Sequence, residues 1–122
     1  MDIKSYTAGE SLVGKQYCAV KNTANGVVLA GAGERAVGIL VKDSALKFAV
    51  GDTVGVAVCD TTFALAGANV AVGAELMVDA TGRLITATAG NYVVAVSDEA
   101  GSVEERIRVQ LKTYKLPEVV TP

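Results

Sequence analysis

The sequence of 122 residues predicts an all-β protein, and three observations carry this prediction. Short segments rich in strand-forming residues alternate with Gly-, Asn- and Asp-containing turn signals, at the interval typical of all-β domains. No stretch repeats apolar residues at helical spacing over about three turns. The apolar residues are mostly 20 Val and 19 Ala, against 2 Phe, 4 Tyr and no Trp, so the core must be built from small side chains.

The strands follow one another with short connections. Turn residues such as Asn25-Gly26, Gly51-Asp52 and Gly90-Asn91 separate them. Residues 44–49 permit one short turn of helix. We expect nine strands, at 16–21, 26–30, 36–42, 53–60, 62–65, 75–78, 84–86, 92–97 and 105–114.

The turn between 75–78 and 84–86 is the clearest local signal in the chain. Asp79 can hydrogen-bond the backbone that follows it, and Gly82 can adopt the left-handed conformation that closes a short loop. The flanking segments are short and rich in strand formers. We therefore expect a β-hairpin whose charged residues belong to a solvated end.

The last predicted strand shows the clearest period of two. Ile107, Val109 and Leu111 alternate with charged or polar residues, so one face of the strand is apolar. A solvated surface explains the charged face, and a sharper hypothesis is that this face meets an acidic partner. This charged face carries a basic row, Arg106, Arg108 and Lys112.

The chain has the length of a single domain with one core. We interpret residues 1–11 as a polar N-terminal arm, 12–114 as the β domain and 115–122, which contain both prolines, as a C-terminal tail. The predicted architecture is a compact small barrel or β-sandwich, jelly-roll or β-tulip-like, with extended N- and C-terminal arms. The strand order stays open, because turn spacing does not encode it.

The triplet Ala-Val-Gly occurs three times, beginning at residues 36, 49 and 71. The last two copies begin similar stretches of sequence, AVGDTVGV and AVGAELMV. They look like equivalent corners at which the chain enters a strand. Their spacing is irregular, so the sequence predicts no solenoid.

Composition excludes several partners. The net charge of −2 and the lack of a long basic run argue against nucleic-acid binding. No window approaches the roughly 18 apolar residues of a membrane span, and the N-terminus lacks the apolar segment of a signal peptide. We expect a protein made and retained in a cytoplasm. Cys18 and Cys59 lie among strand-like residues and are expected to be buried thiols rather than a disulfide.

No set of residues predicts catalysis, a metal site or a cofactor. The absence of His excludes imidazole-based sites, and the two distant cysteines argue against a thiolate zinc site. Residues 9–16 match most of a phosphate-binding loop but have Gln16 in place of the metal-binding hydroxyl, and the glycines at 31–38 lack dinucleotide spacing. The acidic pairs at 98–99 and 104–105 are interpreted as exposed loop ends. Residues 50–54 resemble a corner of biotinyl and lipoyl domains, but no lysine has the neighbours such carriers need.

Several motifs carry a resemblance to a known family. A Gly corner at Val50-Gly51-Asp52 enters a strand, an Asp-x-x-Gly-Arg hairpin follows at 79–83, and residues 93–96 precede a closing strand at 107–111. In these features the chain resembles the small decoration, or capsid cement, proteins of tailed bacteriophages, over roughly residues 6–112.

This resemblance implies a structural virion protein without enzymatic activity or cofactor. It implies a homotrimer on the outer surface of the capsid, assembled in the host cytoplasm, where it bridges subunits of the major capsid protein. We expect residues 1–11 to act as an arm that adds a strand to an exposed sheet edge of a neighbour. The expected partner-binding residues are Met1, Asp2, Ile3, Lys4, Ser5, Tyr6, Arg106, Arg108 and Lys112.

The alternative function is a non-catalytic β-rich module that binds a glycan or a host protein. The scarcity of aromatic side chains argues against it, because sugar-binding clefts need aromatic walls. A small enzyme is a third class, for which the sequence offers no catalytic set.

Overall fold

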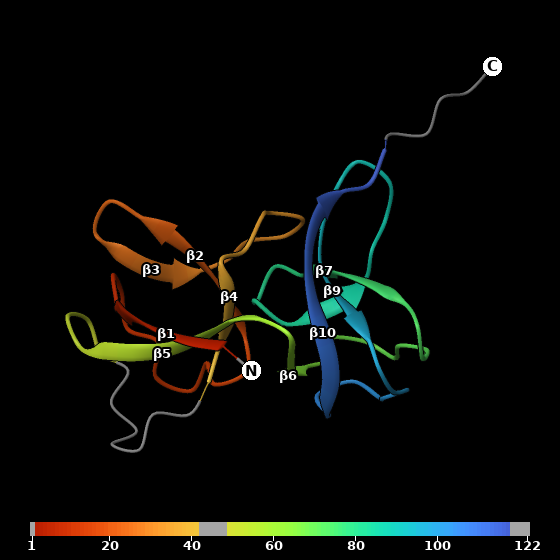
Figure 1. Cartoon of the computed structure of the whole chain (residues 1–122), viewed down its shortest axis with the longest axis horizontal. Helices are drawn as coiled ribbons and strands as arrows, with labels where there is room; N and C mark the ends of the chain where they lie inside the picture. The colour runs from red at the N-terminus through yellow and green to blue at the C-terminus, as the bar shows by residue number, and fades with distance from the viewer. Residues whose placement is uncertain (1, 42–48, 118–122) are drawn as a thin grey trace.

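The computed structural model describes residues 2–41 and 49–117 and contains two five-stranded antiparallel sheets (Figure 1). This confirms the all-β prediction and favours a sandwich-like arrangement, because neither sheet closes into a barrel. The first sheet has the order β1-β5-β4-β2-β3 and the second β6-β10-β9-β7-β8. The strands are β1 (Asp2–Thr7), β2 (Ala19–Thr23), β3 (Gly26–Leu29), β4 (Gly38–Leu40), β5 (Thr53–Cys59), β6 (Thr61–Leu65), β7 (Glu75–Val78), β8 (Leu84–Thr86), β9 (Tyr92–Ser97) and β10 (Arg106–Lys115).

All nine predicted strands are present. Three of them, β7, β8 and β9, have the predicted bounds, and the others differ by a few residues at their ends. Strands β2 and β4 are shorter than predicted, because Tyr17 turns with φ of +69° before β2 and residues 36–37 run irregularly before β4. The short helical turn predicted at 44–49 lies almost entirely outside the described residues.

The N-terminal segment is not an arm, and that prediction is wrong. Asp2–Thr7 form β1, an edge strand paired with β5 over its whole length. Ala8 is buried, and the Glu10 carboxylate accepts a hydrogen bond from the Leu29 backbone N–H at 2.7 Å. The segment is polar because an edge strand buries only part of its surface, and pairing with β5 is a long-range contact that local sequence does not reveal.

At the C-terminal end, β10 continues through Lys115, where a tail was predicted to begin. Leu116 follows the strand and exchanges backbone hydrogen bonds with the turn at Gly90 and Asn91. The rest of the predicted tail, 118–122, lies outside the described residues.

The two sheets repeat one topology. Adding five to each strand number of the first sheet reproduces the order of the second. Backbone hydrogen bonds repeat as well: Ala8 N–H donates to the Asp52 carbonyl at 2.8 Å, and Ala66 N–H donates to the Glu105 carbonyl at 2.9 Å. We therefore describe the chain as a first unit, β1–β5, and a second unit, β6–β10, joined at Asp60.

The Ala-Val-Gly corners are not the equivalent positions of the two units. Gly51 and Gly73 both have positive φ, +86° and +80°, and both precede a strand, as the sequence suggested. In the repeated topology, however, Gly51 corresponds to Glu104, with φ of +68°, and Gly73 corresponds to Tyr17. The repeat is thus carried by backbone geometry rather than by a conserved triplet.

Each unit has apolar side chains in its interior. Instead of the single predicted core there are two clusters. One lies wholly in the first unit and includes Leu12, Leu40 and Val56. The other fills the second unit and extends across the boundary to the first. Its members from the first unit are Ala19, Ala30, Ala36 and Ile39.

Backbone hydrogen bonds also join the units. Ala19 N–H donates to the Gly82 carbonyl at 2.7 Å, and Leu65 N–H donates to the Tyr17 carbonyl at 3.0 Å. Gly33 N–H donates to the Val78 carbonyl at 2.9 Å. Because the contact between units is both apolar and hydrogen-bonded, we expect them to unfold together.

Gly38 in β4 is required by close packing of the backbone. A Cβ there would overlap the Ala57 carbonyl oxygen on the neighbouring strand. We expect Gly38→Ala to lower the free energy of unfolding by about 3 kcal/mol, because neither backbone can move without breaking the sheet.

The matched control is Gly55→Ala in the adjacent strand of the same sheet. A Cβ at Gly55 would meet only side-chain atoms, the nearest 3.2 Å away on Ile3. Its effect should stay within about 1 kcal/mol. Urea unfolding measures both variants, and equal midpoints for the two would contradict this account.

Candidate partner-binding surfaces

The described residues contain no group of three or more His, Cys, Asp or Glu side chains placed to hold a metal ion. The acidic side chains instead order loops. Glu99 Oε1 accepts a hydrogen bond from the Arg108 backbone N–H at 3.0 Å, and Glu105 Oε1 accepts one from the Ser102 N–H at 2.6 Å. Within the described ranges, no helix is long and apolar enough to cross a membrane. Surfaces, rather than a cluster of reactive groups, are therefore the candidate functional features.

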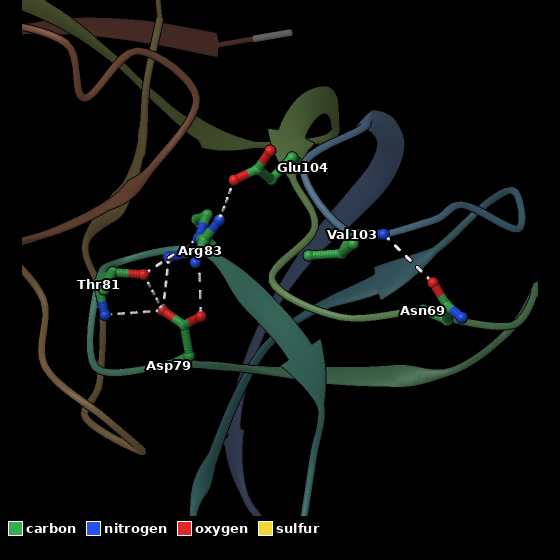
Figure 2. A network of polar contacts seen from close by, with 6 residues as sticks. All are labelled: Asn69, Asp79, Thr81, Arg83, Val103 and Glu104. Atoms are coloured by element: carbon green, nitrogen blue, oxygen red, sulfur yellow. Dashed lines mark hydrogen bonds and ion pairs between the residues drawn. The ribbon is translucent and has the colours of Figure 1, made fainter.

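The predicted hairpin turn is confirmed and belongs to a polar network (Figure 2). Asp79 Oδ1 accepts hydrogen bonds from the backbone N–H groups of Thr81 at 2.8 Å and Arg83 at 3.0 Å, and Gly82 has φ of +83°. Arg83 Nη1 lies 3.4 Å from Glu104 Oε1, at the corner that precedes β10. The network fixes the β7–β8 turn against that corner, so its role is structural.

The predicted basic row is present on β10, but its members lie in different surroundings. Arg106 and Arg108 are exposed and alternate with buried side chains, as the period of two predicted. Arg108 Nε lies 3.9 Å from Asp98 Oδ2. Lys112 is exposed beyond Leu111, where the pairing of β10 with β9 becomes irregular. The row is therefore not one uniform cationic face.

Arg106 joins the two units. Its guanidinium carbon lies 4.8 Å from the ring centroid of Phe63 and 5.4 Å from that of Tyr17, and Nη1 donates a hydrogen bond to the Tyr17 hydroxyl at 3.3 Å. Cation–π contacts of this kind stabilise partly exposed positions. The sequence predicts a partner contact for Arg106 but not its contact with Tyr17, because the two residues lie far apart in the chain.

The predicted N-terminal partner-binding residues now lie on or next to the edge strand β1. Met1 is outside the described residues, and of Asp2 only the backbone is described. The next three side chains are exposed, Ile3 to 55%, and Tyr6 is half-buried against the cluster of the first unit. In the described ranges β1 is the edge strand of its sheet, and β3 meets its outer edge only at the end, where Ala8 and Val27 form a parallel bridge. The predicted partner-binding residues on β1 are Asp2, Ile3, Lys4, Ser5 and Tyr6.

The outer edge of β1 presents backbone groups to solvent. Ala8 directs its N–H to Asp52 and its carbonyl to Gly51, so it faces β5. Because successive residues of an antiparallel strand alternate in direction, Tyr6 also faces β5 and Ser5 faces away. The Ser5 N–H and carbonyl are thus available to a strand from another molecule.

Two grooves lie at the boundary between the units. One, of about 340 Å³, is lined by residues that include Lys15, Cys18, Arg83 and Glu104. The other, of about 500 Å³, we call the cationic groove. It is lined by Lys21, Asn22, Glu34, Arg35, Val37 and Thr113.

Three side chains have shifted pKa values. Burial raises the pKa of the Cys18 thiol, which therefore stays protonated and is a poor nucleophile. Cys18 is buried as predicted, Cys59 only partly, and no disulfide joins them. The hydrogen bond from Lys21 lowers the pKa of Glu34, and the hydrogen bond to Glu75 raises the pKa of Tyr114.

Comparisons with known proteins bear on the fold. No family model matches the chain, and no curated protein matches its sequence. Among solved structures, the chain is similar to the head fiber gp8.5 N base of bacteriophage phi29, with 17% sequence identity and a TM-score of 0.74. The likeness covers 94% of this chain and 98% of that chain. The two chains therefore share a fold along almost their whole length.

The bond from Tyr114 to Glu75 predicts a pH effect. Glu75→Gln removes the carboxylate that favours the protonated phenol, so the pKa of Tyr114 should fall toward its ordinary value of 10.0. Ultraviolet titration of the tyrosinate band measures this, and Tyr114→Phe identifies the signal. Glu99→Gln, a carboxylate change away from Tyr114, is the control and should leave the titration unchanged.

The sign of the accompanying stability change follows from the raised pKa. The folded state holds the Tyr114 proton more tightly than the unfolded state, so this contribution is present below pH 10 and is lost as pH rises through the raised pKa. An unchanged titration in Glu75→Gln would contradict the assigned bond.

Proposed function

We propose that the protein is a structural component of a phage virion, which decorates the outer capsid surface and stabilises it by bridging major capsid subunits. The observation that carries this proposal is the similarity to a phage head fiber base over nearly the full length of both chains. The family resemblance of the strand and turn motifs supports the same class of protein.

The surface of the described residues supports a role in attachment. The outer edge of β1 offers backbone hydrogen-bond groups, and β-strand addition uses such groups without needing a pocket. The cationic groove is open, and its lining includes the exposed Asn22, Arg35 and Thr113 and the half-buried Lys21 and Glu34. These features suit contact with an extended segment of another protein better than enclosure of a small substrate.

Attachment as a homotrimer would explain how weak contacts stabilise a shell. A contact of micromolar strength corresponds to about −8 kcal/mol, and linked contacts add through effective concentration. A trimer that binds several capsid subunits at once therefore dissociates only when all of its contacts break together. Pressure on the shell would have to overcome this combined barrier.

Light scattering and co-sedimentation test the function. We expect a particle of about three times the chain mass of 12.4 kDa, which sediments with expanded, undecorated capsid shells from its own virus and saturates their threefold positions. A monomer that stays in the supernatant would contradict the proposal. A glycan array would then test the alternative binding module.

The role of β1 has its own test, Ser5→Pro. Proline lacks the N–H that Ser5 directs outward, so the pairing of β1 with β5 should persist while strand addition is blocked. Shell binding should weaken about tenfold or more, since each 1.4 kcal/mol is a factor of about ten. Removing residues 1–10 would be a poor test, because Ala8 and Glu10 support the first unit.

The matched control is Ser5→Ala, which removes the side chain and keeps the N–H. It should bind shells like the unmodified protein. Circular dichroism and thermal unfolding establish that both variants fold. Normal shell binding by a folded Ser5→Pro variant would exclude strand addition at β1.

A further inference from the structure

The cationic groove brings together segments that are distant in the chain. Lys21 and Asn22 come from β2, Arg35 and Val37 from the connection to β4, and Thr113 from β10 of the second unit. Its volume of about 500 Å³ lies within the range of roughly 300–1,000 Å³ typical of ligand clefts. It is therefore large enough for several residues of an extended peptide.

A narrow slot continues the groove along the boundary between the units. The two share Ala36, Val37 and Thr113, and the lining of the slot also includes Val58, Leu111 and Lys112. Its volume of about 10 Å³ admits no more than a water-sized group. The groove thus narrows from a wide end to a slot.

The charges around the groove are unequal. Glu34 is the one acidic side chain among the described lining residues, and Lys21 Nζ already pairs with it at 2.9 Å. Arg35 lines the groove and Lys112 lines the slot. Neither side chain has an ion-pair partner within the described ranges. The chain as a whole is negative, at −2, so this local excess of positive charge is not a general property of its surface.

The wall formed by β10 also has unpaired backbone. Strand β6 pairs with β10 only from Arg106 to Gln110, and Leu111 N–H donates to the Asp60 carbonyl at 2.9 Å. Beyond that point β10 continues to Lys115, with β9 on one side and no described strand on the other. Residues 112–115 therefore have no described strand partner on that side, and Thr113 lies at the wall of the cationic groove.

We propose that the cationic groove binds an extended acidic peptide segment, which adds a strand to residues 112–115 and places carboxylates against Arg35 and Lys112. Backbone pairing supplies the affinity and the two cations select the charge. The inference deepens the proposed function by giving the chemistry of the virion partner, and it rests on that function only for the partner's location.

The experiment uses the full chain and a fluorescein-labelled peptide of alternating Glu and Val, about ten residues long, as an extended strand. Fluorescence anisotropy should show binding that weakens with added salt, and a peptide of alternating Lys and Val should not bind. The variant Arg35→Gln/Lys112→Gln should bind the acidic peptide about tenfold more weakly. Lys15→Gln/Arg83→Gln makes the same change in net charge in the other groove at the boundary and should bind the acidic peptide normally.

Backbone amide exchange separates strand addition from a purely ionic contact. The acidic peptide should protect amides within 112–115, whereas binding through side-chain charges alone would leave their exchange unchanged and overturn the proposal. Equal loss of binding in the two double variants would also overturn it, because bulk charge would then explain the affinity.

Failure of this inference can be distinguished from failure of the proposed function. Shell sedimentation requires no peptide, and peptide binding requires no shell. Peptide binding without shell binding would refute the virion role and keep the groove assignment. Shell binding without peptide binding would refute the groove assignment and leave the role of β1 intact.

Discussion

The Ala-Gly step after the first strand of each unit holds that unit together. Ala8 binds the start of β5 through its N–H and its carbonyl, and Gly9 N–H donates to Val27 on β3 at 2.8 Å. The two ends of the sheet are thereby tied to one point, and the second unit repeats this at Ala66 and Gly67. Both alanines are buried, and a Cβ on Gly67 would overlap the Asp79 carboxylate. Only small residues fit where three segments meet.

Local sequence signals predicted most of the strands and turns. The features that they missed depend on contacts between residues distant in the chain. The Asp79 turn and the alternation in β10 are properties of a few consecutive residues, so both were predicted from the sequence. Strand β1 was missed because its only substantially buried apolar side chain is Tyr6, and its partner β5 is distant. The repeat was missed because equivalent positions share hydrogen bonds rather than residue types. The groove and the contact of Arg106 with Tyr17 likewise depend on packing between units, which no local pattern encodes.

Equivalent positions of the two units differ in polarity. Ala19 is buried against the second unit, whereas Glu75, its equivalent on β7, is exposed. Ala57 is buried on β5, and its equivalent Gln110 is exposed on β10. The second unit therefore ends in polar side chains where the first ends in small apolar ones.

The pairing of two units has a consequence for attachment. The two proposed attachment sites lie on different units, at the edge strand β1 in the first and at the end of β10 in the second. The hydrogen bonds and the apolar cluster at the boundary fix the two sites relative to each other. A rigid body with two separate attachment sites can contact two neighbouring proteins at a defined spacing. Because rigid linkage raises the effective concentration at the second site, neither contact would have to be strong in the proposed bridging role.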